Sequence, residues 1–228
     1  MFLPGFKALQ TMELLLVRHA ESEGNVRGVM QGRVDFPLSP QGLQQSACLA
    51  RHLKEHYREA PPDFFLASPL KRAWETAEVI AETLQIPTPE ADAQLVEVSS
   101  GIFSGLTWPE ALERYPEDCS RFKQARDWGV VPEGESREVL WQRARDFLKA
   151  LSAQKPAKAQ GLVVTHGGFI RALLGVVAAV PPSENLFICI DNTSLSLIGL
   201  EGDRRYIRFV NRTQHLDPCD FQPDYLPK

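Results

Sequence analysis

The chain has 228 residues, of which 43% are hydrophobic and 24% charged, and its formal net charge is −4. This size and composition fit one globular α/β domain, or one domain with a small appended subdomain. The chain lacks the basic excess of a general nucleic-acid-binding protein, and no stretch reaches the ~18 uninterrupted apolar residues of a membrane helix. We therefore expect neither nucleic acid nor a membrane as a partner.

The first residues and the cysteines bear on where the protein resides. Residues 1–11 (MFLPGFKALQT) lack the basic start and long apolar run of a secretion signal. We interpret them as a flexible extension, or as the product of a misplaced start before Met12, preceding a single domain of residues 12–228. The four cysteines form no CxxC pair and show no metal-ligand spacing to a histidine, which favours free thiols and a cytoplasmic protein.

Two short aliphatic runs predict buried parallel strands, and a histidine follows each of them. Residues 13–17 (ELLLV) precede Arg18 and His19, and residues 161–165 (GLVVT) precede His166. A third run, residues 63–67, ends at a Ser-Pro pair.

Serine caps and apolar periodicity predict the helices between these strands. Ser39-Pro40 is typical of an N-cap followed by the first helical residue, and it opens an amphipathic stretch to about Tyr57. Ser68-Pro69 repeats the signal for a helix to about Leu84. Ser136 is expected to cap a third helix, and residues 168–177 form a fourth directly after His166.

The C-terminal part predicts three more strands, over residues 186–190, 194–200 and 206–210, the last two joined by a turn at 201–203. Strands alternating with helices predict a largely parallel sheet covered on both faces, and the late run of strands suggests that one is antiparallel. Residues 101–135, rich in Trp, Pro, Arg and Glu, break the pattern, and we interpret them as a lid. The expected fold class is α/β, a three-layer α/β/α sandwich with a mostly parallel sheet, one antiparallel strand and a small lid insertion.

The two strand-end histidines give the first indication of function. Ligands of open α/β sheets bind beyond the carboxyl ends of the strands, where His19 and His166 would meet in one crevice. Arg18 offers a guanidinium fork suited to phosphate oxygens. Arg72 falls in the first turn of a predicted helix, where the helix dipole disfavours a cation unless an anion binds there. A solvated surface arginine beside Lys71 is the alternative for Arg72.

The residues around His19 carry a resemblance to a known family. LLLVRHAESEGN resembles the signature of the histidine phosphatase superfamily, the phosphoglycerate-mutase-like proteins, whose motif is Arg-His-Gly followed by Glu and Ser or Thr. Further blocks match in the family's order and spacing across nearly the whole chain: MQGRVDFPLSPQG (30–42), ASPLKRAWETA (67–77), LVEVSSGIFSGLT (95–107), PEGES (132–136) and VVTHGGFIRALL (163–174).

The resemblance implies roles for individual residues, and no metal or other cofactor. His19 would be the nucleophile that becomes phosphohistidine, and Glu97 the proton donor to the leaving oxygen. The other residues implied are Arg18, Arg72 and His166 in the phosphate pocket, Asn25 and Gln31 as hydrogen-bonding partners of the substrate, and, more weakly, Ser136 and the amide of Gly167. His19 must attack as a neutral imidazole, so we expect a backbone carbonyl to accept a hydrogen bond from its other ring nitrogen.

Two departures from the family pattern affect the functional prediction. Ala20 replaces the glycine that follows the nucleophile, which narrows the allowed backbone angles. Cofactor-dependent mutases follow the acid with Arg-His-Tyr-Gly, whereas here residues 98–101 read Val-Ser-Ser-Gly, and the chain is shorter than a typical mutase. We therefore predict a metal-independent phosphatase acting on phosphomonoesters of small metabolites, rather than a mutase.

Several alternatives remain open at this level. They are a cofactor-dependent phosphoglycerate mutase, a catalytically idle regulatory protein on the same fold, and a protein-phosphohistidine phosphatase, although relatives of that last kind are usually shorter and lack a lid. Aromatic and basic residues in the lid, among them Trp128 and Arg126, would suit a small phosphorylated metabolite with an apolar or acidic portion, or would simply pack the lid. The sequence leaves a homodimer open.

Overall fold

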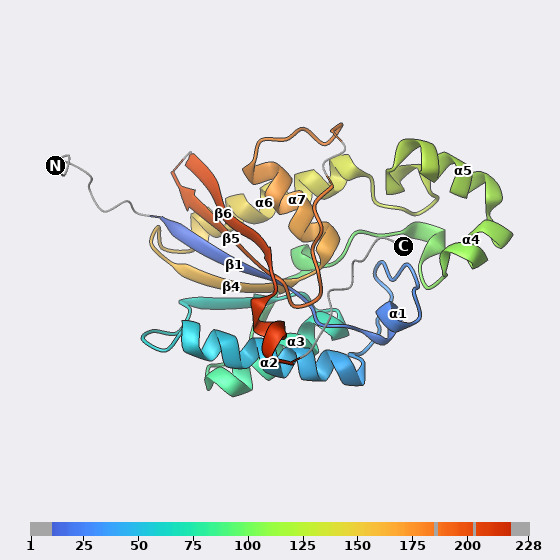
Figure 1. Cartoon of the computed structure of the whole chain (residues 1–228). Coiled ribbons are helices and arrows are strands. Elements are labelled where there is room, and N and C mark those ends of the chain that lie inside the picture. Colours follow the sequence, from blue (N-terminus) through green and yellow to red (C-terminus); the bar gives the residue numbers. More distant parts are fainter. Residues whose placement is uncertain (1–10, 185–186, 203, 220–228) are drawn as a thin grey trace.

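The computed structural model describes residues 11–184, 187–202 and 204–219 of the chain. A six-stranded sheet crosses the molecule, with strand order β3-β2-β4-β1-β5-β6 (Figure 1). The strands are β1 (Met12–Arg18), β2 (Phe64–Ala67), β3 (Glu90–Ala91), β4 (Gln160–Thr165), β5 (Leu195–Glu201) and β6 (Arg204–Arg212). β5 runs antiparallel to both of its neighbours, and the other neighbouring pairs are parallel. The prediction of a mostly parallel sheet with one antiparallel strand is confirmed.

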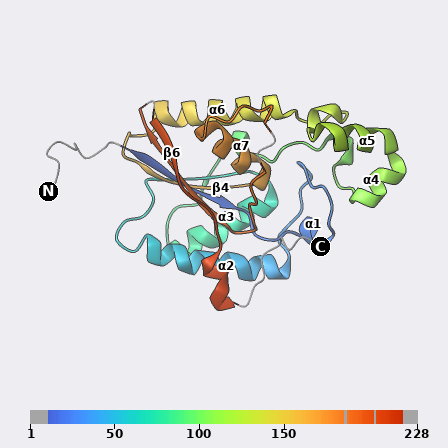
Figure 2. The same cartoon turned by 45° about the horizontal axis from the view of Figure 1, so that its top comes forward.

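Helices cover both faces of the sheet, as the α/β pattern predicts. α2 (Pro40–His56) and α3 (Lys71–Leu84) pack on one face, and α6 (Arg137–Gln154) and α7 (Gly167–Val177) pack on the other (Figures 1 and 2). β1 supplies both cores through its alternating side chains: Leu14 and Leu16 pack with α6 and α7, whereas Leu15 and Val17 pack with α2 and α3. This alternation explains why the strand is apolar along its whole length.

The two Ser-Pro pairs have different outcomes. Ser39 caps α2, because its hydroxyl accepts a hydrogen bond from the Gly42 amide at 2.9 Å and Pro40 is the first helical residue. The prediction for Ser68 is wrong, since α3 begins at Lys71 after Leu70, with no side-chain cap. The Ser68 hydroxyl lies instead 2.8 Å from Nε2 of His166.

Residues 101–135 form an insertion built around its own small aromatic core. It contains α4 (Trp108–Arg114), α5 (Pro116–Ala125) and the 3₁₀ turns η2 (Gly101–Phe103) and η3 (Trp128–Val130). Phe103 is fully buried in this core. The insertion projects beyond the end of the sheet where β1 finishes, near the short helix α1 (Glu23–Val26) (Figures 1 and 2).

One predicted strand is absent. Residues 187–190 form no strand, and Leu186 lies outside the described residues, as do residues 1–10 and Asp203 of the predicted turn. The carbonyls of Ile188 and Ile190 accept hydrogen bonds from the side chains of Arg171 and Arg18 rather than from a neighbouring strand.

The cysteines only partly match expectation. Cys119 and Cys189 are free thiols, but Cys48 is disulfide-bonded, so the prediction of free thiols is wrong for this residue. No helix in the described part of the chain is long and apolar enough to cross a bilayer. Two short 3₁₀ elements complete the fold, η1 (Ala93–Leu95) before the Glu97 segment and η4 (Gln214–Cys219) near the C-terminus.

Candidate active site

His19 and His166 meet because their strands are neighbours in the sheet. β1 and β4 run parallel with Arg18 opposite Thr165, so both chains leave the sheet at the same edge. The His19 amide donates to the Thr165 carbonyl at 2.9 Å. The two imidazole centroids lie 5.1 Å apart, so the sheet register alone brings both rings to one site.

The backbone fixes the tautomer of His19. Its Nδ1 lies 2.7 Å from the carbonyl oxygen of Ala20. A carbonyl can only accept, so Nδ1 carries the proton and Nε2 keeps a lone pair. Ala20 itself is held by a hydrogen bond from its amide to Thr76 Oγ1 and does not adopt a positive φ, so alanine in place of glycine creates no backbone strain.

Burial and nearby cations keep His19 neutral. The side chain is 3% exposed. Desolvation, followed by the positive charges of Arg72 and Arg18, lowers the pKa of His19 well below 6.5, although the Ala20 carbonyl acts in the opposite direction. The ring is therefore an uncharged imidazole with a free lone pair near neutral pH.

Arg72 is a buried cation without a carboxylate partner among the described residues. It lies in the first turn of α3 and is 1% exposed, which rules out the surface alternative. Its Nη1 and Nη2 donate to the carbonyls of Val34 and Gly32, both at 2.9 Å, and its Nε is buried with no partner in the part of the chain described. Burial lowers its pKa from 12.5 to about 10, so it remains charged at neutral pH.

His166 adds a second unsatisfied nitrogen to the same site. Its Nε2 contacts Ser68, while its Nδ1 is buried with no partner among the described residues. Burial, then Arg72, then His19 lower the pKa of His166 well below 6.5. Such buried polar atoms are costly unless a ligand or water satisfies them. The unpaired nitrogens of His166 and Arg72 therefore form a site suited to an anion.

Glu97 reaches this site from the segment that follows η1. The Gly168 amide, at the start of α7, donates to Glu97 Oε2 at 3.1 Å, and the Val98 amide donates to Oε1 at 2.8 Å. A Cβ atom on residue 168 would lie 2.3 Å from Oε1, so this contact requires glycine. The carboxyl group is thus held by two backbone amides at the pocket wall.

One cavity of about 200 Å³ is lined by Arg18, His19, Arg72 and Glu97, among other residues. A second cavity of about 510 Å³ shares four lining residues with it: Val98, Trp128, Gly168 and Arg171. The first cavity holds His19 beside Arg18, Arg72 and Glu97. The second is also lined by charged residues, such as Arg137 and Glu184, but most of its surface is apolar.

The remaining predicted residues are placed differently. Gln31 lines the smaller cavity, and its Oε1 accepts from the hydroxyl of Ser22 at 2.8 Å. Asn25 forms the capping box of α1 with Ser22, and Ser136 caps α6. Asn25, Ser136 and Gly167 are not among the residues that line either cavity.

Sequence reasoning missed residues that act through non-local contacts. Ser68, Thr76 and Gly168 hold His166, Ala20 and Glu97 from other parts of the chain. The glycine pair after His166 was the one available signal for Gly168. Among the described residues, no three His, Cys, Asp or Glu side chains gather in a metal-binding group.

Comparison with known proteins agrees with this geometry. Residues 14–213 match the model of the histidine phosphatase superfamily (branch 1). Phosphoserine phosphatase 1 of Hydrogenobacter thermophilus is 34% identical over 90% of this chain and 94% of its own length. The metal-independent phosphoserine phosphatase of Arabidopsis thaliana is 32% identical over 93% of this chain and 86% of its own length. The solved structure of Bacillus stearothermophilus YhfR superposes with a TM-score of 0.78 at 26% identity, covering 90% of this chain and all of that one.

Proposed function

The chain belongs to the histidine phosphatase superfamily, and we propose that it hydrolyses phosphomonoesters without a metal, with His19 carrying the phosphoryl group. Nε2 of His19 attacks phosphorus while the ester P–O bond breaks, which gives a phosphohistidine and an alcohol. Water then attacks the phosphohistidine, the N–P bond breaks, and inorganic phosphate leaves.

The observation that carries this proposal is the buried Arg72, which forms no ion pair with a carboxylate in the described part of the chain. A phosphate monoester brings about two negative charges near neutral pH. The guanidinium of Arg72, the adjacent Arg18 and the unsatisfied Nδ1 of His166 surround the place where that charge would sit. Fixed donors of this kind stabilise the charge that spreads over the phosphoryl oxygens in the transition state.

Glu97 serves as the proton donor and then the base. Its carboxyl group lies in the same cavity as His19 and gives a proton to the departing alkoxide. The resulting carboxylate then takes a proton from the water that attacks the phosphohistidine. One group can fill both roles because the two half-reactions run through the same geometry in opposite directions.

The substrate is a small phosphomonoester, and phosphoserine is the leading candidate because two relatives are named phosphoserine phosphatases. The leaving group would extend into the larger cavity, over the shared wall of Trp128 and Arg171. Arg171 donates through Nε to the Ile188 carbonyl and lies over the Phe187 ring, and its terminal N–H groups, for which the described residues supply no acceptor, can face a carboxylate there. The 101–135 insertion, which supplies Trp128, would close over this group as a lid.

A mutase is the principal competing activity. The residues after Glu97 provide no cationic grip for a second phosphate: Val98 lines both cavities, and the hydroxyl of Ser99 donates to the Glu133 carbonyl. With 3-phosphoglycerate as substrate we expect release of inorganic phosphate, and isomerisation to the 2-phosphate would favour the mutase. An idle regulatory protein would hydrolyse none of these esters. A homodimer in the cytoplasm stays a prediction.

Replacing His19 tests the proposal directly. His19→Ala is expected to abolish turnover of phosphoserine and p-nitrophenyl phosphate and to remove the phosphoenzyme seen by intact-mass spectrometry after alkaline quenching. His56→Ala, which changes an exposed histidine on α2, should alter neither result. EDTA should leave the rate of the unmodified enzyme unchanged. Residual phosphoenzyme in His19→Ala would overturn the assignment of the nucleophile.

A further inference from the structure

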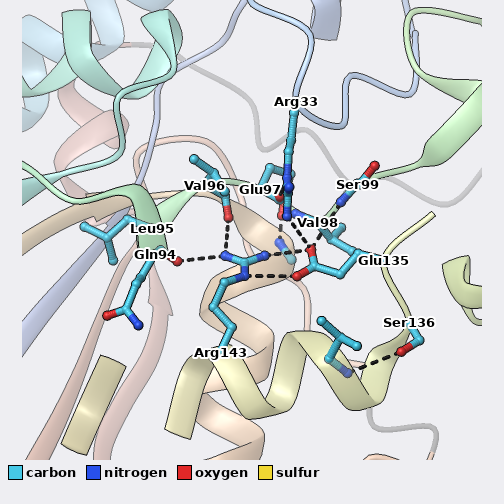
Figure 3. A network of polar contacts seen from close by, with 12 residues as sticks. Arg33, Gln94, Leu95, Val96, Glu97, Val98, Ser99, Glu135, Ser136 and Arg143 are labelled. Atoms are coloured by element: carbon cyan, nitrogen blue, oxygen red, sulfur yellow. Dashed lines mark hydrogen bonds and ion pairs between the residues drawn. The ribbon is translucent and has the colours of Figure 1, made fainter. Parts of the chain in front are cut away.

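The segment that carries Glu97 is held by side chains rather than by regular secondary structure. Residues 96–99 belong to no helix or strand, so their backbone polar groups need partners from elsewhere. Nη1 of Arg143 donates to the carbonyls of Gln94 and Val96, both at 2.7 Å, and Nε of Arg33 donates to the carbonyl of Glu97 itself at 3.2 Å (Figure 3).

A buried carboxylate ties these arginines together. Glu135 receives a two-pronged contact from Arg143, with Nε to Oε1 at 3.0 Å and Nη2 to Oε2 at 2.7 Å (Figure 3). Its Oε2 also accepts from Arg33 at 3.1 Å and from the Ser99 amide at 3.3 Å. The side chains of Glu135 and Arg143 are 7% and 14% exposed, so this ion pair is shielded from solvent.

The network holds the backbone by hydrogen bonds on both sides of Glu97. Arg143 fixes the residue before it, while Glu135 fixes Ser99 through its carboxylate and through its own amide, which donates to the Ser99 carbonyl at 3.0 Å. Glu135 contributes to the wall of the larger cavity, but Arg143 lines neither cavity next to His19. It therefore has no position from which to touch the substrate.

We infer that Arg143, held by its ion pair with Glu135, is a positioning residue that sets where the Glu97 carboxyl meets the leaving oxygen. The inference rests on the proposed role of Glu97 as the acid. Proton transfer requires the donor within hydrogen-bond reach of the leaving oxygen. Gly168 and Val98 hold the carboxyl end of Glu97, and the arginine–carboxylate network holds its backbone.

Arg143→Lys tests the geometry while keeping the charge. This matters because the charge of Arg143 also contributes to the lowered pKa of His166. Lysine has one ammonium group in place of the planar fork, so it loses the two-pronged contact to Glu135 while the charge near His166 remains. The matched control is Arg145→Lys on the same helix, where Gln142, at 3.3 Å, is the one acceptor for this arginine among the described residues.

The readout is kcat/KM, which covers the steps up to departure of the alcohol, for phosphoserine and for p-nitrophenyl phosphate. The serine alkoxide needs a proton, whereas p-nitrophenolate needs little help. A misplaced acid should therefore slow phosphoserine by about tenfold to a hundredfold and leave p-nitrophenyl phosphate within about twofold. Glu97→Gln should show the same selectivity more strongly, and Arg145→Lys should match the unmodified enzyme.

The double variant Glu97→Gln/Arg143→Lys separates positioning from general damage. If Arg143 acts through Glu97, the second change should add nothing to the loss caused by the first. Additive losses, or equal slowing of both esters by Arg143→Lys alone, would overturn the inference. Equal slowing of both esters by Glu97→Gln would instead refute the acid role in the proposed function.

Arg33→Ala keeps the inference testable if Arg143→Lys does not fold. The side chain of Arg33 is 48% exposed, so its loss should spare the fold while it removes the contacts to the Glu97 carbonyl and to Glu135. We expect selective slowing of phosphoserine by a few fold that again disappears in the Glu97→Gln background. No selectivity in a folded Arg33→Ala enzyme would overturn the inference.

Discussion

At the scale of single residues, the two glycines after His166 differ in whether they leave room for a Cβ atom. A Cβ atom on Gly168 would lie 2.3 Å from Glu97 Oε1, whereas one on Gly167 would lie 3.6 Å from the Arg18 side chain, an ordinary contact. Gly168→Ala must therefore push the Glu97 carboxyl aside. Gly167→Ala can be accommodated without movement.

We predict that Gly168→Ala lowers kcat/KM for phosphoserine by about a hundredfold, since small displacements of a catalytic group have effects of that size. Gly167→Ala should stay within about threefold of the unmodified enzyme. Circular dichroism of both variants should remain unchanged, because neither glycine has a positive φ. Equal activity of the two alanine variants would contradict the contact between Gly168 and Glu97.

The site residues that can be predicted from the sequence are those next to a local sequence signal, such as a strand end. His19 and His166 follow apolar strands directly, so their meeting at one edge follows from the parallel sheet alone. Glu135 lies inside the matched PEGES block, yet the neighbouring Ser136 is the residue with a local signal, because serine before a helix is typical of an N-cap. The role of Glu135 depends on Arg143 and on Ser99, which lies 36 residues upstream, and no local pattern reveals these contacts.

At the scale of elements, the same dipeptide gave one correct and one wrong helix start. Ser39 keeps its hydroxyl for the Gly42 amide, but the hydroxyl of Ser68 is engaged by His166. Residues 187–190 form no strand for a related reason, because arginine side chains bind the carbonyls of Ile188 and Ile190. In these cases a tertiary contact overrode a sound local preference.

The 101–135 insertion has a separate core, and this makes its contribution to substrate binding testable. Phe103 packs against four aromatic rings there, with centroids 6.2–6.5 Å away, and one of them is Trp128 of the shared cavity wall. Phe147, equally buried, packs against Phe169 in the main core. The two phenylalanines are therefore matched in burial and differ in which core they fill.

We expect Phe103→Leu to raise the KM for phosphoserine several fold, because the ring that is removed packs against Trp128. The free energy of unfolding of the sheet should change little. Phe147→Leu should lower the free energy of unfolding by about 1–3 kcal/mol and leave KM unchanged. Urea denaturation followed by far-ultraviolet circular dichroism, together with steady-state kinetics, separates these effects. An unchanged KM in Phe103→Leu would argue against the insertion as part of the substrate site.

At the scale of the whole molecule, several buried histidines are kept neutral in one folded structure. His19 and His166 are neutral at the reaction centre, and His215 is neutral where η4 packs against α2. The hydroxyl of Thr193 donates to the Asn192 carbonyl, so it accepts a hydrogen bond from Nε2 of His215 at 3.0 Å. Burial, with a smaller contribution from His52, lowers the pKa of His215 from 6.5 to about 4.

This arrangement predicts the direction in which acid affects stability. Above pH 6.5 the imidazole is neutral in both the folded and the unfolded chain, so it adds no pH dependence. As the pH falls from 6.5 to about 4, His215 binds a proton in the unfolded chain but stays neutral in the folded chain. The folded state therefore loses about 3 kcal/mol from this residue over that window, and His19 and His166 act in the same direction.

Urea denaturation at pH 7 and pH 4.5 measures this loss. We predict that His215→Asn unfolds with a smaller difference in free energy between the two pH values than the unmodified chain, because asparagine does not titrate. His56→Asn, which changes an exposed histidine on the same side of the sheet, should keep the original difference. If His215→Asn also kept the original difference, His215 would not be a source of the acid sensitivity and the prediction would be wrong.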